Sequence, residues 1–140
     1  MLRDVVIKYY YQGNGYNYNC SEAMIHAIDE YYGLNLPEQV LYASSGFGGG
    51  ARHDEMCGGL ASAVAALGLL YSVNGRGHDS DKMKELVSEL FRRFDEQFSS
   101  SRCKYLKEHY YIPDRKCEQV LAVCADILED IMSNNPTINK

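Results

Sequence analysis

Five cysteines are the side chains of this sequence with the clearest capacity for chemistry, and they are Cys20, Cys57, Cys103, Cys117 and Cys124. A thiolate is both a nucleophile and a metal ligand, so grouped cysteines can exchange electrons or hold a metal ion. Four thiolates within reach of one another would suit zinc, an iron–sulfur cluster, or two dithiol/disulfide couples. The cysteines therefore predict a redox or metal site.

The spacing of the cysteines argues against the sites that short local motifs build. The sequence contains no C-x-x-C pair, as a thioredoxin-type couple or a zinc ribbon would require. The first four cysteines are separated by 37, 46 and 14 positions. Only the tertiary fold can bring them together.

Four of the cysteines, all except Cys124, fall within about the first turn of a predicted helix. A helix start presents unpaired N–H groups and the positive end of the macrodipole, which stabilise an anion by about 0.3 to 1 kcal/mol. We therefore expect a lowered thiol pKa at these four positions, which are the candidate catalytic residues and metal ligands. Cys57, which follows a glycine-rich loop, is expected to be the most reactive thiol or a principal ligand. Cys124 lies on the apolar stripe of the last helix and is expected to be a buried small hydrophobe.

The segment before Cys57 supplies further candidates. Bare backbone there could approach a cofactor or the thiol closely. The candidate cofactor-binding positions are Gly48, Gly49, Gly50 and Gly58. His53 lies four residues before Cys57 and could act as a base, a proton relay or a fourth ligand. The glycine pattern also fits a dinucleotide-binding fingerprint formally, but it lacks the preceding apolar strand that such a site needs.

The elements that must position these residues are helical. Apolar residues recur at helical spacing, and no run of four to eight residues shows the alternation of a strand. We predict an all-α bundle of about five to six helices, with the glycine-rich loop before the central helix. The helical segments are expected at 2–12, 20–32, 57–71, 81–98 and 115–132, with short ones at 37–43 and after Ser101.

Length and charge limit the remaining possibilities. With 140 residues, the chain is expected to form one domain over 1–132, followed by a frayed tail over 133–140. The net charge of −5 argues against a nucleic-acid partner. The longest mostly apolar run, 60–73, is too short for a membrane span, and no secretory leader is recognisable, so we expect a cytoplasmic protein. The partner is an unknown redox protein or small molecule, and the tyrosine-rich segment near Cys20 could form a homodimer surface.

Nearly the whole chain resembles a family of putative redox-active proteins named for the cysteine pattern C, then C-G-A-x-x-G, then C and C. The matching segments are 19–23, 46–50, 57–62, 94–106 and 116–120. The resemblance implies that the four shared cysteines are those at the predicted helix starts and that Cys124 is extra. Two positions depart from the pattern, because Gly59 replaces its alanine and Ser62 its final glycine.

Three functions follow from these observations. The first is a redox or electron-transfer protein, and so a thiol- or cluster-based oxidoreductase, whose four cysteines bind an iron–sulfur cluster or cycle as disulfides. The second is a zinc- or other metal-binding module without turnover on the same cysteines. The third is a helical binding protein in which the thiols are incidental.

Overall fold

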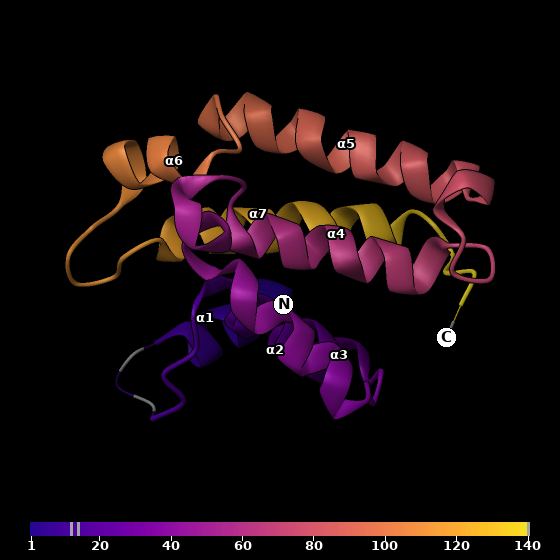
Figure 1. Cartoon of the computed structure of the whole chain (residues 1–140), viewed down its shortest axis with the longest axis horizontal. Helices are drawn as coiled ribbons and strands as arrows, with labels where there is room; N and C mark the ends of the chain where they lie inside the picture. The colour runs from indigo at the N-terminus through magenta and orange to yellow at the C-terminus, as the bar shows by residue number, and fades with distance from the viewer. Residues whose placement is uncertain (12, 14, 140) are drawn as a thin grey trace.

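Seven α-helices make up most of residues 1–11, 13 and 15–139, which a computed structural model describes (Figure 1). Their bounds are α1 Leu2–Tyr10, α2 Cys20–Tyr32, α3 Glu38–Ala43, α4 Gly58–Tyr71, α5 Asp81–Phe98, α6 Cys103–Tyr110 and α7 Glu118–Ser133. The expected all-α class is confirmed. The seven helices of the described residues match the seven segments expected from the sequence, and the bundle reaches seven instead of five to six when the two short ones, α3 and α6, are counted.

Local sequence explains where several helices begin and end. The Asn19 side chain accepts a hydrogen bond from the backbone N–H of Glu22, and the Glu22 side chain accepts one from the backbone N–H of Asn19. Helix α2 therefore starts in a complete capping box. Gly33 ends the same helix in the left-handed conformation at φ 60°. Helix α1 ends at Tyr10, and Gln12, where the sequence placed its end, lies outside the described residues.

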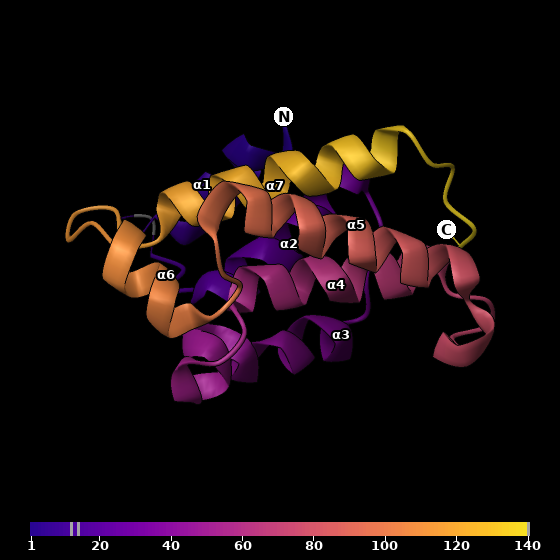
Figure 2. The same ribbon diagram turned by 90° about the horizontal axis from the view of Figure 1, so that it is seen from above.

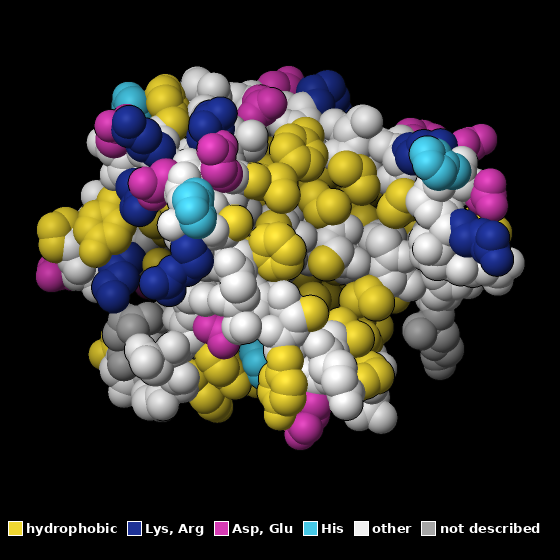
Figure 3. Space-filling model, viewed as in Figure 1, with side chains coloured by type: hydrophobic (Ala, Val, Ile, Leu, Met, Phe, Trp, Pro, Cys, Tyr) yellow, Lys and Arg dark blue, Asp and Glu magenta, His cyan; other side chains and the backbone are white. Residues whose placement is uncertain are grey.

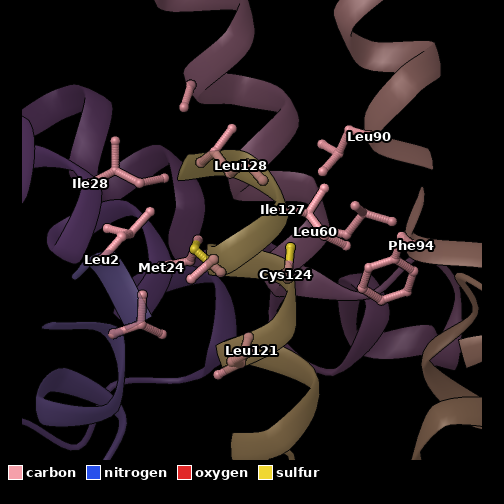
Figure 4. Close-up of a cluster of buried hydrophobic side chains, with 14 of the residues drawn as sticks. Leu2, Met24, Ile28, Leu60, Leu90, Phe94, Leu121, Cys124, Ile127 and Leu128 are labelled. Atoms are coloured by element: carbon pink, nitrogen blue, oxygen red, sulfur yellow. The ribbon is translucent and has the colours of Figure 1, made fainter. Parts of the chain in front are cut away.

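Helix α4 lies at the centre of the bundle, as its nearly uniform apolar sequence predicts. It packs against α2, α5 and α7. Figure 2 shows α5 and α7 running alongside it. The largest buried side chains around it include Met24 of α2, Phe94 of α5 and Leu121 of α7 (Figure 4). This packing fixes where α4 begins. It thereby also fixes the position of Cys57, which immediately precedes the first residue of α4.

The C-terminal tail returns to the far end of α4. The backbone N–H groups of Ile138 and Asn139 donate to the carbonyl of Leu70, and the Asn139 side chain donates to the carbonyls of Leu69 and Ser72. The frayed tail expected from the sequence stays a prediction, and Lys140 and Asn14 lie outside the described residues. Among the described helices, none has the length and apolar character required to span a membrane.

Candidate functional site

Four cysteines stand at helix starts, as the sequence predicts. Cys20 and Cys103 are the first residues of α2 and α6, and Cys57 and Cys117 immediately precede α4 and α7. The starts of α4, α6 and α7 lie towards the same end of the bundle, on the left in Figure 1. Cys124 instead lies within α7 and is fully buried in the core (Figure 4). The fold therefore separates the four shared cysteines from the fifth.

Three of these thiols line one pocket. Cys20, Cys103 and Cys117 border a cavity of about 290 Å³. Cys20 and Cys117 are partly exposed, whereas Cys103 retains 8% exposure. Cys57 is 7% exposed and is not among the lining residues. The pocket therefore offers two accessible thiols and a third, more buried one.

Cys57 does not line the pocket but lies close to Cys20. A Cβ atom on Gly58, the residue after Cys57, would stand 2.7 Å from the Cys20 Sγ atom and 2.7 Å from the carbonyl oxygen of Phe47. These contacts are too short for real Cβ atoms, so glycine is required if Cys20 is to pack over the start of α4. The sequence named Gly58 as a cofactor position, and the structure gives it this packing contact.

The glycine-rich loop forms a left-handed turn. Gly49, Gly50, Ala51 and Arg52 have φ angles of 65°, 63°, 57° and 63°. Each non-glycine residue in this conformation costs roughly 1 to 2 kcal/mol. Such strain is concentrated at functional sites, where the surrounding structure holds it in place.

This turn brings bare backbone against the cysteines. A Cβ atom on Gly50 would stand 2.7 Å from the Cβ of Cys103 and would clash with the backbone nitrogen of Glu55. Gly48 packs in the same way against the Asn19 side chain, whereas Gly49 lines the pocket and has open space around it. A role for these glycines in cofactor binding stays a prediction.

A short backbone pairing joins two of the cysteines. The N–H of Cys57 donates to the carbonyl of Ser101 at 2.8 Å, and the N–H of Cys103 donates to the carbonyl of Glu55. The residues between them, Met56 and Arg102, form an isolated antiparallel bridge. This pairing fixes Cys57 relative to Cys103. The sequence gives no local signal for it, because the paired segments are 46 positions apart.

The thiol pKa values correct one expectation. Burial raises the pKa of Cys57 well above its usual value, and the neighbouring Cys20 and Cys124 raise it further. Burial also raises the pKa of Cys103, and raises that of Cys117 to about 11, with Cys20 adding to both increases. The expected lowering of the pKa at the helix starts is therefore wrong for these three thiols. Loss of hydration opposes the thiolate more strongly than the helix ends favour it. The raised pKa of Cys57 also argues against this residue as the most reactive thiol, because the thiolate is the reactive form.

One cation opposes this increase. Lys107 lines the pocket, and its charge lowers the pKa of both Cys103 and Cys117, although by less than burial raises it. Its ammonium group is held by the Asp54 carboxylate at 2.7 Å. The sequence analysis missed Lys107. Its spacing is the signal that could have identified it, since it follows Cys103 by one helical turn on α6.

The structure does not bring His53 into the thiol pocket. Its side chain is exposed, and the ring nitrogen Nδ1 lies 3.0 Å from the carbonyl oxygen of Ala51 within the left-handed turn. The geometry gives no support to its expected role as base, relay or ligand.

The arrangement of the described residues does not fit a metal ion. Among them, no group of three or more His, Cys, Asp or Glu side chains is placed so that it could hold one. Zinc and iron–sulfur clusters require several thiolates around one point. The cysteines would have to move to bind either group.

A larger cavity of about 580 Å³ lies elsewhere on the molecule. It is bordered by α2, α3, α4 and α5, and Figure 3 shows hydrophobic side chains gathered over this middle region. Its walls include Ile25, Phe47, Leu69 and Met83 and contain no cysteine.

Alkaline pH is expected to destabilise the fold through Cys124. Burial raises its pKa to about 12, whereas a thiol in the unfolded chain ionises at about 8.5. The folded state therefore retains a proton that the unfolded state loses. The contribution of the buried, protonated Cys124 thiol to the stability of the fold is complete below pH 8.5 and decreases as the pH rises towards 12.

Urea unfolding of the wild type and a Cys124→Ala variant between pH 7 and 11 tests this. The difference in unfolding free energy between the two proteins should narrow as the pH rises. A difference that is independent of pH contradicts the assignment.

The family described as "Putative redox-active protein (C_GCAxxG_C_C)" matches residues 18–131. No curated protein and no solved structure matches the chain. The matched span contains every residue that lines the thiol pocket except Tyr10 and Asn17.

Proposed function

Because the chain belongs to the family of putative redox-active proteins with the C_GCAxxG_C_C pattern, we propose that it is a dithiol–disulfide redox protein. The observation that carries the proposal is the convergence of Cys20, Cys103 and Cys117 on one pocket. These residues are separated by up to 97 positions, yet Cys20 raises the pKa of both Cys103 and Cys117, and Cys103 also raises that of Cys117. We therefore expect two of these thiols to form a disulfide on oxidation.

The reaction follows from accessibility. Cys20 and Cys117 are the partly exposed thiols, so one of them attacks a sulfur atom of a disulfide substrate as the thiolate. The substrate releases one thiol and leaves a mixed disulfide on the protein. A second pocket thiol then attacks the protein sulfur and releases the other half of the substrate. Two protein thiols are thereby oxidised to one disulfide, and the substrate disulfide is reduced to two thiols.

Lys107 and Cys57 have separate roles in this scheme. The Lys107 charge increases the thiolate fraction of Cys103 and Cys117. Cys57 is buried beside Cys20. When Cys20 is part of the first disulfide, the Cys57 thiolate would attack the Cys20 sulfur, which forms a Cys20–Cys57 disulfide and releases the other pocket thiol.

Redox titration of the purified protein tests the proposal. After equilibration with mixtures of oxidised and reduced dithiothreitol, free thiols are counted and disulfides are located by peptide mapping. We expect at least two of the pocket thiols to form a disulfide reversibly and Cys124 to remain free. Fewer than two responsive thiols would contradict the proposal.

Metal analysis distinguishes the remaining alternatives. The protein is purified without oxygen, and iron, acid-labile sulfide and zinc are measured. Stoichiometric iron with sulfide would support a cluster, and stoichiometric zinc would support a metal-binding module. Either result would contradict the dithiol proposal, which requires the thiols to be free.

A further inference from the structure

The thiol pocket carries positive charge in an acidic protein. The chain has a net charge of −5, yet the charged side chains that line this pocket are Lys107 and Lys116. Figure 3 shows Lys and Arg side chains gathered over the same end of the molecule as α6, with Asp and Glu side chains among them. Among the acids around it, Asp54 pairs with Lys107 and so offsets part of its charge, and Glu22 caps α2. Neither acid is a lining residue.

The loop before Cys117 holds Lys116 in an unusual conformation. Lys116 has a φ angle of 53°, in the left-handed region that a side chain rarely adopts. Its backbone exchanges two hydrogen bonds with Ile112, which close the loop immediately before Cys117. Lys116 lines the pocket, and these hydrogen bonds fix its backbone immediately before Cys117.

The size and walls of the pocket limit what can enter. A volume of about 290 Å³ is close to the lower end of the range for small-molecule sites. Tyr10, Tyr18 and Tyr111 supply apolar walls with polar tips. The pocket therefore suits a compact molecule with a short carbon chain.

We propose that the substrates of this pocket are small disulfides that carry carboxylate groups, with the carboxylate held by Lys107 and Lys116. This inference rests on the proposed dithiol function and specifies its substrate class. The exchange is the one described above, in which two protein thiols become a disulfide and one substrate disulfide becomes two carboxylate-bearing thiols. The lysines attract the substrate and orient the carboxylate, so that its sulfur atoms face the pocket thiols.

Three disulfides of similar length and different charge test the inference. They are 3,3′-dithiodipropionate, which is anionic, bis(2-hydroxyethyl) disulfide, which is neutral, and cystamine, which is cationic. The measured quantity is the second-order rate of protein disulfide formation with each probe. Because the three probes differ in intrinsic reactivity, the ratio of the anionic to the neutral rate is compared among protein variants.

The variants are Lys107→Gln and Lys116→Gln, with Lys104→Gln as the matched control. Lys104 lies on the same helix and is exposed, but does not line the pocket. We expect each pocket variant to lower the anionic-to-neutral ratio by about threefold to tenfold, the effect of one nearby charge in a partly solvated site. The anionic-to-neutral rate ratio of the Lys104→Gln control should equal that of the wild type. The preference of the wild type should weaken in 0.5 M salt, because salt screens charges over a few ångströms.

The outcomes separate the two proposals. Equal ratios in all variants, with rapid reaction of every probe, would overturn the charge selectivity and leave the dithiol function intact. If no probe yields a protein disulfide, both proposals are overturned. Lys107→Gln also changes the thiolate fraction, but this affects both rates and cancels in the ratio. Lys116→Gln gives an independent result if removal of Lys107 disturbs the turn that holds Asp54.

Discussion

Replacing Cys20 with serine is expected to slow disulfide formation in the pocket by roughly a hundredfold or more, because an attacking or resolving thiol held in place is lost. Cys20 is the common neighbour of the other cysteines. It contributes to the raised pKa of Cys57, Cys103, Cys117 and Cys124. It is also one of the two partly exposed thiols. Without it, the remaining accessible thiol, Cys117, has only the buried Cys103 as a pocket partner.

The measurement is the rate of disulfide formation with bis(2-hydroxyethyl) disulfide, followed by mass spectrometry. Cys124→Ala is the matched control, since this cysteine lies in the core and outside the pocket. The control should react at the rate of the wild type. A Cys20→Ser variant that reacts as rapidly as the control, with an unchanged circular dichroism spectrum, would show that another pair carries the chemistry.

Replacing Gly50 with alanine is expected to lower the free energy of unfolding by about 2 to 4 kcal/mol, which combines a backbone cost with a packing cost. The φ angle of 63° is unfavourable for a residue with a Cβ atom. The added Cβ would also clash with the backbone of Glu55 and stand 2.7 Å from the Cβ of Cys103. Backbone cannot move aside as a flexible side chain can, so the turn must shift and displace Cys103.

Gly49→Ala is the matched control for this effect. Gly49 has nearly the same φ angle, 65°, but no atom lies within 4 Å of its added Cβ. The Gly49→Ala substitution should therefore lower the free energy of unfolding only by the cost of the left-handed backbone, about 1 to 2 kcal/mol. Urea unfolding of both variants measures the difference. Equal losses in the two variants would show that the contact of Gly50 with Cys103 and Glu55 does not restrain the turn.

Local sequence signals predict much of this fold because they depend on neighbouring residues. The capping box of Asn19 and Glu22 and the terminating Gly33 define α2 within a few positions. The apolar stripe of α5 likewise identifies Leu86, Leu90, Phe94 and Phe98 as its buried face. The same signals place four cysteines at helix starts, and the helix bounds agree with them.

The left-handed turn illustrates where such signals end. Glycines at positions 49 and 50 permit a left-handed backbone, but nothing local predicts that Ala51 and Arg52 will continue it. Contacts with Asn19, Glu55 and Cys103 hold the turn in place. Asn19 and Cys103 are brought there by α2 and α6, so the conformation depends on the assembled fold.

The helical class and the candidate set of four thiols can be predicted from the residues alone, because helix starts and cysteine positions are local properties. How those thiols are divided depends on the assembled fold. It places Cys20, Cys103 and Cys117 around one pocket and buries Cys57 outside the lining of that pocket. It also reverses the expected pKa direction for three thiols, because desolvation depends on what surrounds a side chain and not on its place in a helix.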